Sequence, residues 1–275
     1  MKVVQTRDDF ARVRAGLAAP IGLVPTMGAL HAGHRALLDA ARAECATVVT
    51  TNFVNPLQFG PSEDLARYPR TLDADLALCA DAGVDVVWAP SVTDVYPTGG
   101  GSSITVSPGP LGDILEGTVR PGHFAGVLTV VAKFFNLVRP DRGYFGEKDY
   151  QQLAVIRRMV DELDMGLSVV GVPTVREDDG LALSSRNRYL SDGERAQAVA
   201  LSRALFTGAA ASAAGAKAVL AAATAQLAAA PGIAVDYLEL RGADLGETPE
   251  HGPARLLIAA RLGSTRLIDN VPVEL

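Results

Sequence analysis

The 275-residue chain has few cysteines, few lysines and few aromatic side chains. Its two cysteines, Cys45 and Cys79, lack a metal-ligand spacing and lie among small apolar residues, so we expect buried, reduced thiols. No apolar run approaches the roughly 18 residues that a membrane span requires. No secretory signal is expected either, because the first residues run directly into polar and charged ones. We therefore expect a soluble, cytoplasmic protein.

The charge of the chain is moderate and acidic. A formal net charge of −6 argues against a protein that coats nucleic acid or anionic lipid, although it permits a small basic site for a phosphate ligand. Hydrophobic residues make up 48% and charged residues 20%, which excludes disorder as the general description. Only four of the 25 basic residues are lysines. Lys148 stands out among them, because it lies between glycine and acidic residues in a short loop.

The first part of the chain alternates strand and helix patterns, which predicts a parallel sheet with covered faces. Strands are expected at 21–25, 47–52, 84–88, 144–145 and 167–172. Helices are expected at 7–14, 33–44, 72–82, 125–137 and 150–163. Glycines and prolines predict a long loop over 90–110, with a short edge strand at 103–106.

After Pro173 the pattern changes. An alanine-rich stretch, 194–230, predicts two helices broken near Gly208 and Gly215, and its leucines give it a packing face. Strands are expected to follow at 233–240, 255–261 and 265–270. The predicted fold class is therefore α/β, with a Rossmann-like parallel-sheet N-terminal domain over 1–174 and a smaller α+β C-terminal domain over 175–275.

The most informative cluster follows the strand expected at 21–25 and reads PTMGALHAGH over 25–34. His31 and His34 are three residues apart, on one face of an emerging helix turn. Gly28 and Gly33 allow a ligand to approach the backbone, and a helix start favours a phosphate. Imidazoles in that position can donate hydrogen bonds to phosphate oxygens.

Three further clusters carry polar chemistry. Gly146–Asp149, followed by Gln151 and Gln152, lies between a strand and a helix, and its Lys148 suits nucleotide phosphates. Residues 183–188 form a predicted loop with two hydroxyl and two guanidinium groups, and this loop can close on a triphosphate. The apolar stretch 53–59 contains the amide of Gln58, which can hold a substrate carboxylate without neutralising it.

Taken together, these blocks resemble the pantothenate synthetase (pantoate–β-alanine ligase) family, over nearly the whole chain. The residues that carry the resemblance read PTMGALHAGH at 25–34, FVNPLQF at 53–59, YPRTLDAD at 68–75, RPGHFAGVLTVVAKFFN at 120–136, YFGEKDYQQ at 144–152 and VPTVREDDGLALSSRNRYL at 172–190. The family belongs to the H-x-G-H nucleotidyltransferase superfamily.

The resemblance implies a two-step ligation in which ATP and (R)-pantoate form pantoyl adenylate and β-alanine then displaces AMP. It implies catalytic roles for His34, as proton donor, His31, Lys148, Ser184, Ser185 and Arg186. It implies that Gln58 binds pantoate and β-alanine and that Gln152 binds pantoate. The implied ATP site consists of Met27, Gly28, Ala29, Leu30, His31, Ala32, Gly33, His34, Gly146, Glu147, Lys148, Asp149, Val175, Leu183, Ser184, Ser185 and Arg186.

Two positions depart from the family pattern. Leu183 stands where methionine is usual, which conserves volume and apolarity. Ala74 interrupts an acidic pair, leaving Asp73 and Asp75, so no protein ligand for Mg²⁺ is predicted and we expect the metal to be held by ATP phosphates and water. His123 is expected either to line the site or to have a capping or packing role, and His251 to lie on the surface. The resemblance also implies a homodimer acting on small molecules.

Two other functions fit parts of the pattern. A nucleotidyltransferase that moves a nucleotide onto a phosphate would need neither Gln58 nor Gln152. A regulatory module that binds nucleotide without turnover would need neither His34 nor Lys148, whereas this chain has both.

Overall fold

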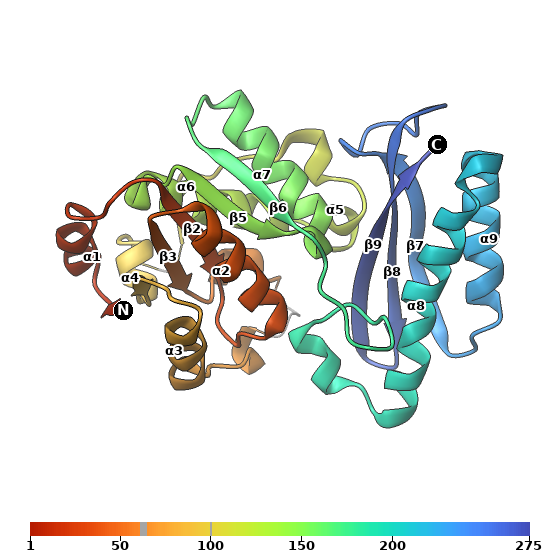
Figure 1. Ribbon diagram of the computed structural model, residues 1–275, viewed down its shortest axis with the longest axis horizontal. Helices are drawn as coiled ribbons and strands as arrows, with labels where there is room; N and C mark the ends of the chain where they lie inside the picture. Colours follow the sequence, from red (N-terminus) through yellow and green to blue (C-terminus); the bar gives the residue numbers. More distant parts are fainter. Residues whose placement is uncertain (61–64, 100) are drawn as a thin grey trace. The chain divides into compact units, whose positions relative to one another are not determined.

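The computed structural model describes residues 1–60, 65–99 and 101–275 (Figure 1). The chain divides into two compact units. The first unit comprises Met1–Glu147 and Gln151–Pro173, and the second comprises Lys148–Tyr150 and Thr174–Leu275. The segment that contains Lys148 thus belongs to the second unit, although it follows a strand of the first.

A six-stranded sheet forms the centre of the first unit. Its strands are β1 (Lys2–Val4), β2 (Ile21–Thr26), β3 (Thr47–Asn52), β4 (Val86–Trp88), β5 (Arg142–Gly146) and β6 (Ser168–Val172). They lie in the order β1-β4-β3-β2-β5-β6, and every neighbouring pair is parallel. Short apolar runs such as that of β2 are typical of strands buried on both faces.

Helices cover both faces of this sheet (Figure 1). They are α1 (Arg7–Arg14), α2 (Ala32–Glu44), α3 (Leu72–Asp81), α4 (Val92–Val95), α5 (Glu116–Val119), α6 (His123–Val138) and α7 (Tyr150–Glu162). On one face, Leu38 of α2 and Cys79 of α3 share a buried cluster with Val87. On the other face, Trp88 stacks on Phe10 of α1 with ring centroids 4.6 Å apart and meets Phe134 of α6 edge-on. The opposite facing of Val87 and Trp88 follows from the two-residue period of a strand.

The order of the strands marks one position at the edge of the sheet. The chain passes from β2 to β3 and β4 on one side, whereas β5 and β6 lie on the other side of β2. Open α/β sheets bind ligands outside the carboxyl ends of the strands at such a reversal. The register pairs Gly22 with Arg142 and Leu23 with Gly143, so β2 and β5 are direct neighbours at this reversal.

The second unit packs two helices on an antiparallel sheet. Its elements are α8 (Asp192–Ala210), α9 (Ala216–Ala228), β7 (Ile233–Gly242), β8 (Pro253–Leu262) and β9 (Thr265–Glu274), with the strands in that order. Leu201 and Leu205 of α8 and Val219 of α9 share a buried core with Leu256 and Ile258 of β8. The alanine-rich stretch is therefore a packing scaffold.

The predicted α/β class is confirmed, and three local predictions need correction. Residues 103–106 form no strand but an irregular segment, in which Ile104 is 81% exposed. The helix expected to break near Gly208 continues to Ala210, because this glycine serves close packing: a Cβ there would lie 2.8 Å from Leu256 Cδ2. Strand β1 was not predicted, because its three residues give no periodicity and are defined by pairing with β4.

Candidate active site

The loop after β2 places His31 and His34 against each other at the start of α2. The N–H of Gly33 donates to His31 Nδ1 at 3.1 Å, and the N–H of His31 donates to His34 Nδ1 at 3.3 Å. These bonds form a reciprocal cap of the helix, and the two ring centroids are 4.2 Å apart. Histidine thus does here what serine and glutamate do in an ordinary capping box.

The cap determines the tautomer of both rings. A ring nitrogen that accepts a hydrogen bond carries no proton, so each neutral imidazole has its proton on Nε2. Protonation to imidazolium would convert Nδ1 to a donor and break the bond to the backbone. In both rings Nε2 is therefore the nitrogen that can donate to an anionic oxygen.

The backbone N–H groups before the histidines have acceptors within the loop and its neighbours. Gly28 donates to Thr26 Oγ1 at 3.3 Å, and Ala29 and Leu30 donate to the Asp75 carboxylate at 3.1 and 2.8 Å. Any contact of this stretch with phosphate oxygens therefore depends more on the imidazole rings than on these amides.

Gln58 ends the short helix η1 (Pro56–Gln58) and is only 9% exposed. Its Nε2 donates to Met27 Sδ at 3.1 Å, so the structure brings two of the predicted residues into direct contact. Its Oε1 accepts from Asn55 Nδ2, which also donates to the Gly126 carbonyl, both at 3.1 Å. Tyr96 fixes the other end of Asn55 by donating its hydroxyl to Oδ1 at 2.8 Å.

Asn55 and Tyr96 hold Gln58 in place and are not among the residues that the sequence predicts for the site. Asn55 lies inside the quoted 53–59 block, but Tyr96 is 41 residues away and is recognisable only from the fold. A Cβ on Gly126 would lie 2.2 Å from the Leu57 carbonyl oxygen, so glycine is required where α6 meets this loop.

His123 has a structural role at the start of α6. Its Nδ1 lies 2.9 Å from the Gln58 carbonyl oxygen, and its Nε2 lies 3.0 Å from Arg120 Nη1. Because a carbonyl only accepts and a guanidinium only donates, this ring carries its proton on Nδ1. Its tautomer is thus opposite to that of His31 and His34. His251 is exposed, as predicted.

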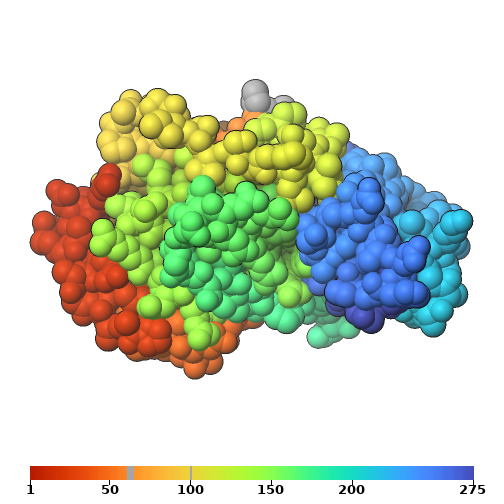
Figure 2. All heavy atoms as spheres, turned by 90° about the horizontal axis from the view of Figure 1, so that it is seen from above, coloured from red at the N-terminus to blue at the C-terminus, as the bar shows by residue number. Residues whose placement is uncertain are grey.

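The two glutamines at the start of α7 differ. Gln151 is buried, accepts from the Glu116 N–H at 3.0 Å and donates to the Leu111 and Ile114 carbonyls, both at 2.8 Å. It therefore anchors the surface segment before α5, drawn in yellow to yellow-green in Figure 2. Gln152, the predicted pantoate contact, is half-buried.

In the second unit, Lys148 is held through its backbone. The Lys148 carbonyl accepts from Asn270 Nδ2 at 2.9 Å, and Asn270 Oδ1 accepts from Arg255 Nε at 2.6 Å. The Arg255 guanidinium also lies 4.0 Å above the ring of Tyr150. Strands β8 and β9 thus position the backbone of Lys148, while its side chain is half-buried. Asp149 is exposed.

The serine-arginine loop is also well ordered by local bonds. The Leu183 N–H donates to the Val175 carbonyl at 3.0 Å, so these two predicted residues are adjacent. Ser184 caps the short helix η5 (Ser185–Tyr189) by accepting from the Arg186 N–H at 3.2 Å. Asn187 ties the loop to Glu177 and to the Ala182 carbonyl.

The predicted site residues are therefore divided between the two units. The first unit contains Met27–His34, Gln58, Gly146, Glu147 and Gln152. The second contains Lys148, Asp149, Val175 and Leu183–Arg186.

Comparison with known proteins identifies the family. The family model described as "Pantoate-beta-alanine ligase" matches residues 2–272. The chain belongs to the pantoate–β-alanine ligase family. It is 60% identical to the pantothenate synthetase of Mycolicibacterium smegmatis over 100% of this chain and 88% of that one, and 58% identical to that of Nocardioides sp. over 99% and 85%.

Solved structures of ligases agree with this assignment. The pantothenate synthetase of Thermus thermophilus matches with a TM-score of 0.92 at 49% identity, over 98% of this chain and 99% of that one. The ligase of Francisella tularensis, complexed with β,γ-ATP and β-alanine, matches with a TM-score of 0.82 at 33% identity, over 98% and 97%. The chain is thus an enzyme of this ligase family.

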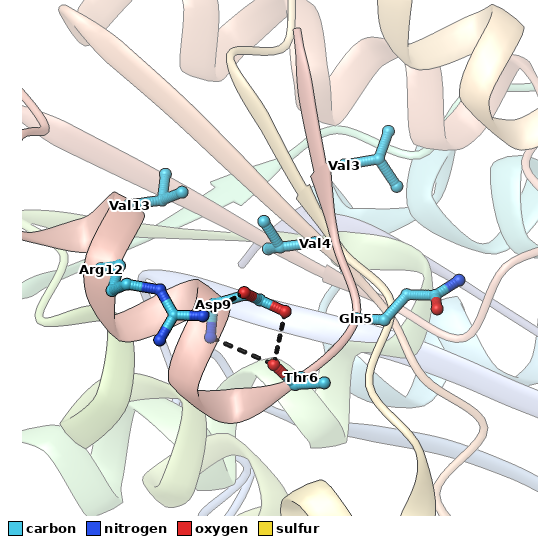
Figure 3. A pocket seen from close by; sticks show the side chains of 7 residues that line it. All are labelled: Val3, Val4, Gln5, Thr6, Asp9, Arg12 and Val13. Atoms are coloured by element: carbon cyan, nitrogen blue, oxygen red, sulfur yellow. Dashed lines mark hydrogen bonds and ion pairs between the residues drawn. The ribbon is translucent and has the colours of Figure 1, made fainter.

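One cavity of the ligase lies apart from these residues. Residues 3–6 and Asp9, Arg12 and Val13 of α1 line a cavity of about 500 Å³ (Figure 3). Its polar groups bond to one another: the Thr6 hydroxyl donates to Asp9, and with Arg12 it keeps the pKa of that carboxyl below its usual value. None of the predicted site residues lines it.

Over 1–60, 65–99 and 101–275, no three His, Cys, Asp or Glu side chains lie together in a way that could hold a metal ion. No helix in the part of the chain that the structure describes is long and apolar enough to cross a membrane.

Proposed function

We propose that this enzyme condenses (R)-pantoate with β-alanine, at the expense of ATP, to give (R)-pantothenate, AMP and pyrophosphate. The observation that carries the proposal is the pair of capped histidines at the carboxyl end of β2, in a chain that belongs to the ligase family. The relative from Francisella tularensis, complexed with β,γ-ATP and β-alanine, supports two of the substrates.

The proposed reaction has two steps through an enzyme-bound pantoyl adenylate. A pantoate carboxylate oxygen attacks the α-phosphorus of ATP, and the bond from that phosphorus to the bridging oxygen breaks as pyrophosphate leaves. The β-alanine nitrogen then attacks the acyl carbon and loses a proton, and AMP leaves with the oxygen that came from pantoate.

The first unit supplies hydrogen-bond donors to the phosphates and uncharged amides that bind the pantoate carboxylate. His31 and His34 donate hydrogen bonds from Nε2 to ATP phosphate oxygens, and the Nε2–H of His34 is the donor to the leaving pyrophosphate. The amides of Gln58 and Gln152 bind pantoate, and Gln58 also contacts β-alanine. An amide leaves the attacking carboxylate more nucleophilic than a guanidinium would, because it does not neutralise the ground state. Met27 packs beside Gln58 and, with residues 28–34, Gly146 and Glu147, binds ATP.

The second unit supplies the cationic and hydroxyl groups. Lys148, Ser184, Ser185 and Arg186 bind the phosphates of ATP and of the leaving pyrophosphate. Asp149, Val175 and Leu183 complete the nucleotide site. A transferase that stops at the nucleotide stage would not use the two amides, and a regulatory module would not need the donors.

We further propose that Mg²⁺ arrives with ATP, held by phosphate oxygens and water, as is common for this ion. The enzyme acts as a homodimer in the cytoplasm, where ATP is available. Sedimentation of the purified chain tests the dimer.

The experiment that tests the function is exchange of labelled pyrophosphate into ATP without β-alanine. Exchange that requires (R)-pantoate is the expected result, because only a reversible acyl adenylate couples pantoate to the release of pyrophosphate. Exchange independent of pantoate favours a transferase, and nucleotide binding without exchange or product favours a regulatory module.

A further inference from the structure

We infer that Asp75 is a positioning residue that sets the conformation of the loop Gly28–Leu30 and thereby the placement of His31 and His34. The inference rests on the proposed function only where it concerns catalysis. Asp75 lies in the first turn of α3, 45 residues after Leu30, and is 3% exposed.

Four hydrogen bonds surround the Asp75 carboxylate. Oδ1 accepts from the Leu30 N–H at 2.8 Å and from the Thr71 hydroxyl at 3.1 Å. Oδ2 accepts from the Ala29 N–H at 3.1 Å and from Asn52 Nδ2 at 2.9 Å. A carboxylate has about four acceptor sites, so all of them are directed at the protein. Asp75 is therefore committed to the loop rather than to a metal ion.

The loop needs such support because its backbone is unusual. Gly28 and Ala29 both have left-handed dihedral angles, with φ of +81° and +52°. A non-glycine residue rarely adopts that region, because its Cβ comes too close to the following carbonyl oxygen. Successive N–H groups in such a turn converge and bind an anion in many proteins. Here the anion is the side chain of Asp75.

The packing around Gly28 leaves no space for a side chain at this position. A Cβ on Gly28 would lie 2.6 Å from Asn52 Oδ1 and 3.0 Å from Asp75 Oδ2. The bond from the Leu30 N–H to Asp75 fixes the backbone of Leu30. The next residue is His31, whose N–H and ring form the helix cap. The two bonds to Asp75 thus set the direction in which the chain enters the histidine pair.

The test compares Asp75→Asn with Asp73→Asn, an exposed carboxylate in the same helix turn. In Asp75→Asn, an NH₂ group replaces one carboxylate oxygen. It would face donors that now bond to Asp75, and those donors would lose their acceptor. We expect pantoate-dependent ATP–pyrophosphate exchange to fall about 10- to 100-fold in Asp75→Asn. Conversion of supplied pantoyl adenylate and β-alanine to pantothenate should stay within about threefold, because that step releases no pyrophosphate. Asp73→Asn should leave both rates unchanged.

A second readout does not depend on turnover. Nitrogen-15 NMR of the imidazoles should show His31 and His34 protonated at Nε2 in the unmodified enzyme. Their signals should shift or broaden in Asp75→Asn, while those of His123 and His251 stay in place. If Asp75→Asn does not fold, Thr71→Val, which removes one donor, should show a smaller effect in the same direction, and Thr71→Ser should restore it.

Several results would overturn the inference. Unchanged imidazole signals in a folded Asp75→Asn enzyme contradict it, and so does an equal loss of both half-reactions, which indicates a general structural role. If the imidazole signals move while exchange is unaffected, positioning of the rings stands and the proposed role of the histidines fails. If the unmodified enzyme shows no exchange, the proposed function fails and the NMR result still decides the inference.

Discussion

Asp75 in the first unit and Asp269 in the second are both buried, at 3% and 4% exposed, but they are stabilised differently. All four donors to Asp75 are uncharged. Asp269 forms a two-bond ion pair with Arg176, at 2.7 and 2.9 Å, and also accepts from the Asn270 N–H. Each aspartate holds a segment that carries proposed ligand-binding residues or leads into them.

Asp75 holds a stretch of backbone, whereas Asp269 holds the side chain of Arg176. Neutral N–H donors fix a backbone direction, which suits the loop before His31, but they leave a net negative charge inside the unit. A guanidinium neutralises the charge and fixes a side chain; Arg176 also donates to the Gly180 carbonyl and so ties the turn before Leu183 to β9. Removing the charge should therefore be more costly at Asp269, where a buried cation would remain.

The largest expected effect follows Asp269→Asn. The Arg176 side chain is 17% exposed and would lose its counter-charge, so the free energy of unfolding should fall by roughly 3–5 kcal/mol. Urea unfolding followed by circular dichroism measures it. Asp178→Asn, an exposed change in the same turn, should stay within about 0.5 kcal/mol. A loss below about 1 kcal/mol for Asp269→Asn would mean that the pair is not the main support of this turn.

His34→Ala and Lys148→Ala test one proposed phosphate ligand from each unit. Each should lower kcat about 100-fold, equivalent to about 3 kcal/mol, because each removes a donor to charge that develops in the reaction. Both variants should remain folded, although His34→Ala also loses the cap and about 1 kcal/mol of stability. A variant with near-normal turnover would remove that residue from the mechanism.

The corresponding change in the first unit, Asp75→Asn, should have a smaller effect on stability than Asp269→Asn. It leaves buried donors without acceptors, which costs roughly 1–3 kcal/mol, but no buried cation. The same urea experiment applies, with Asp73→Asn as control. An equal loss for Asp75→Asn and Asp269→Asn would contradict the distinction between the two aspartates.

The smallest expected effect concerns Cys79. Burial, together with the nearby Asp75 charge, raises the pKa of this thiol from 9.0 to about 11. As pH rises above 9, unfolded chains release the proton first, so the native state loses stability between pH 9 and 11. The unfolding free energy of the unmodified enzyme should fall more steeply over this range than that of Cys79→Ala. Asp75→Asn should reduce the difference; an unchanged difference would mean that burial alone raises the pKa.

Local patterns in the sequence predicted most of the fold. The apolar run of β2 and the periodicity of α2 are local properties, so both elements were predicted within one or two residues. Strand β1 exists only through its partner β4, and residues 103–106 have β-branched side chains but no pairing strand. Those two errors have one cause, because strand pairing is a long-range property.

The candidate site was predictable to a similar extent. Motifs singled out His31, His34 and Gln58, and the structure shows a helix cap joining the histidines and a bond from Gln58 to Met27. The roles of Asp75 and Tyr96 depend on contacts across 41–46 residues, which no local pattern contains. Asp75 lay in a quoted block, but as a position considered for Mg²⁺; its four donors give it another role.

In the proposed reaction, pantoate attacks the α-phosphorus of ATP, and β-alanine then displaces AMP from the acyl carbon. Pantoate labelled with oxygen-18 in its carboxylate tests this claim directly, with mass spectrometry of the products after one turnover. The expected result is one labelled oxygen in AMP and none in pyrophosphate. Unlabelled AMP, or label in pyrophosphate, would contradict the adenylate route.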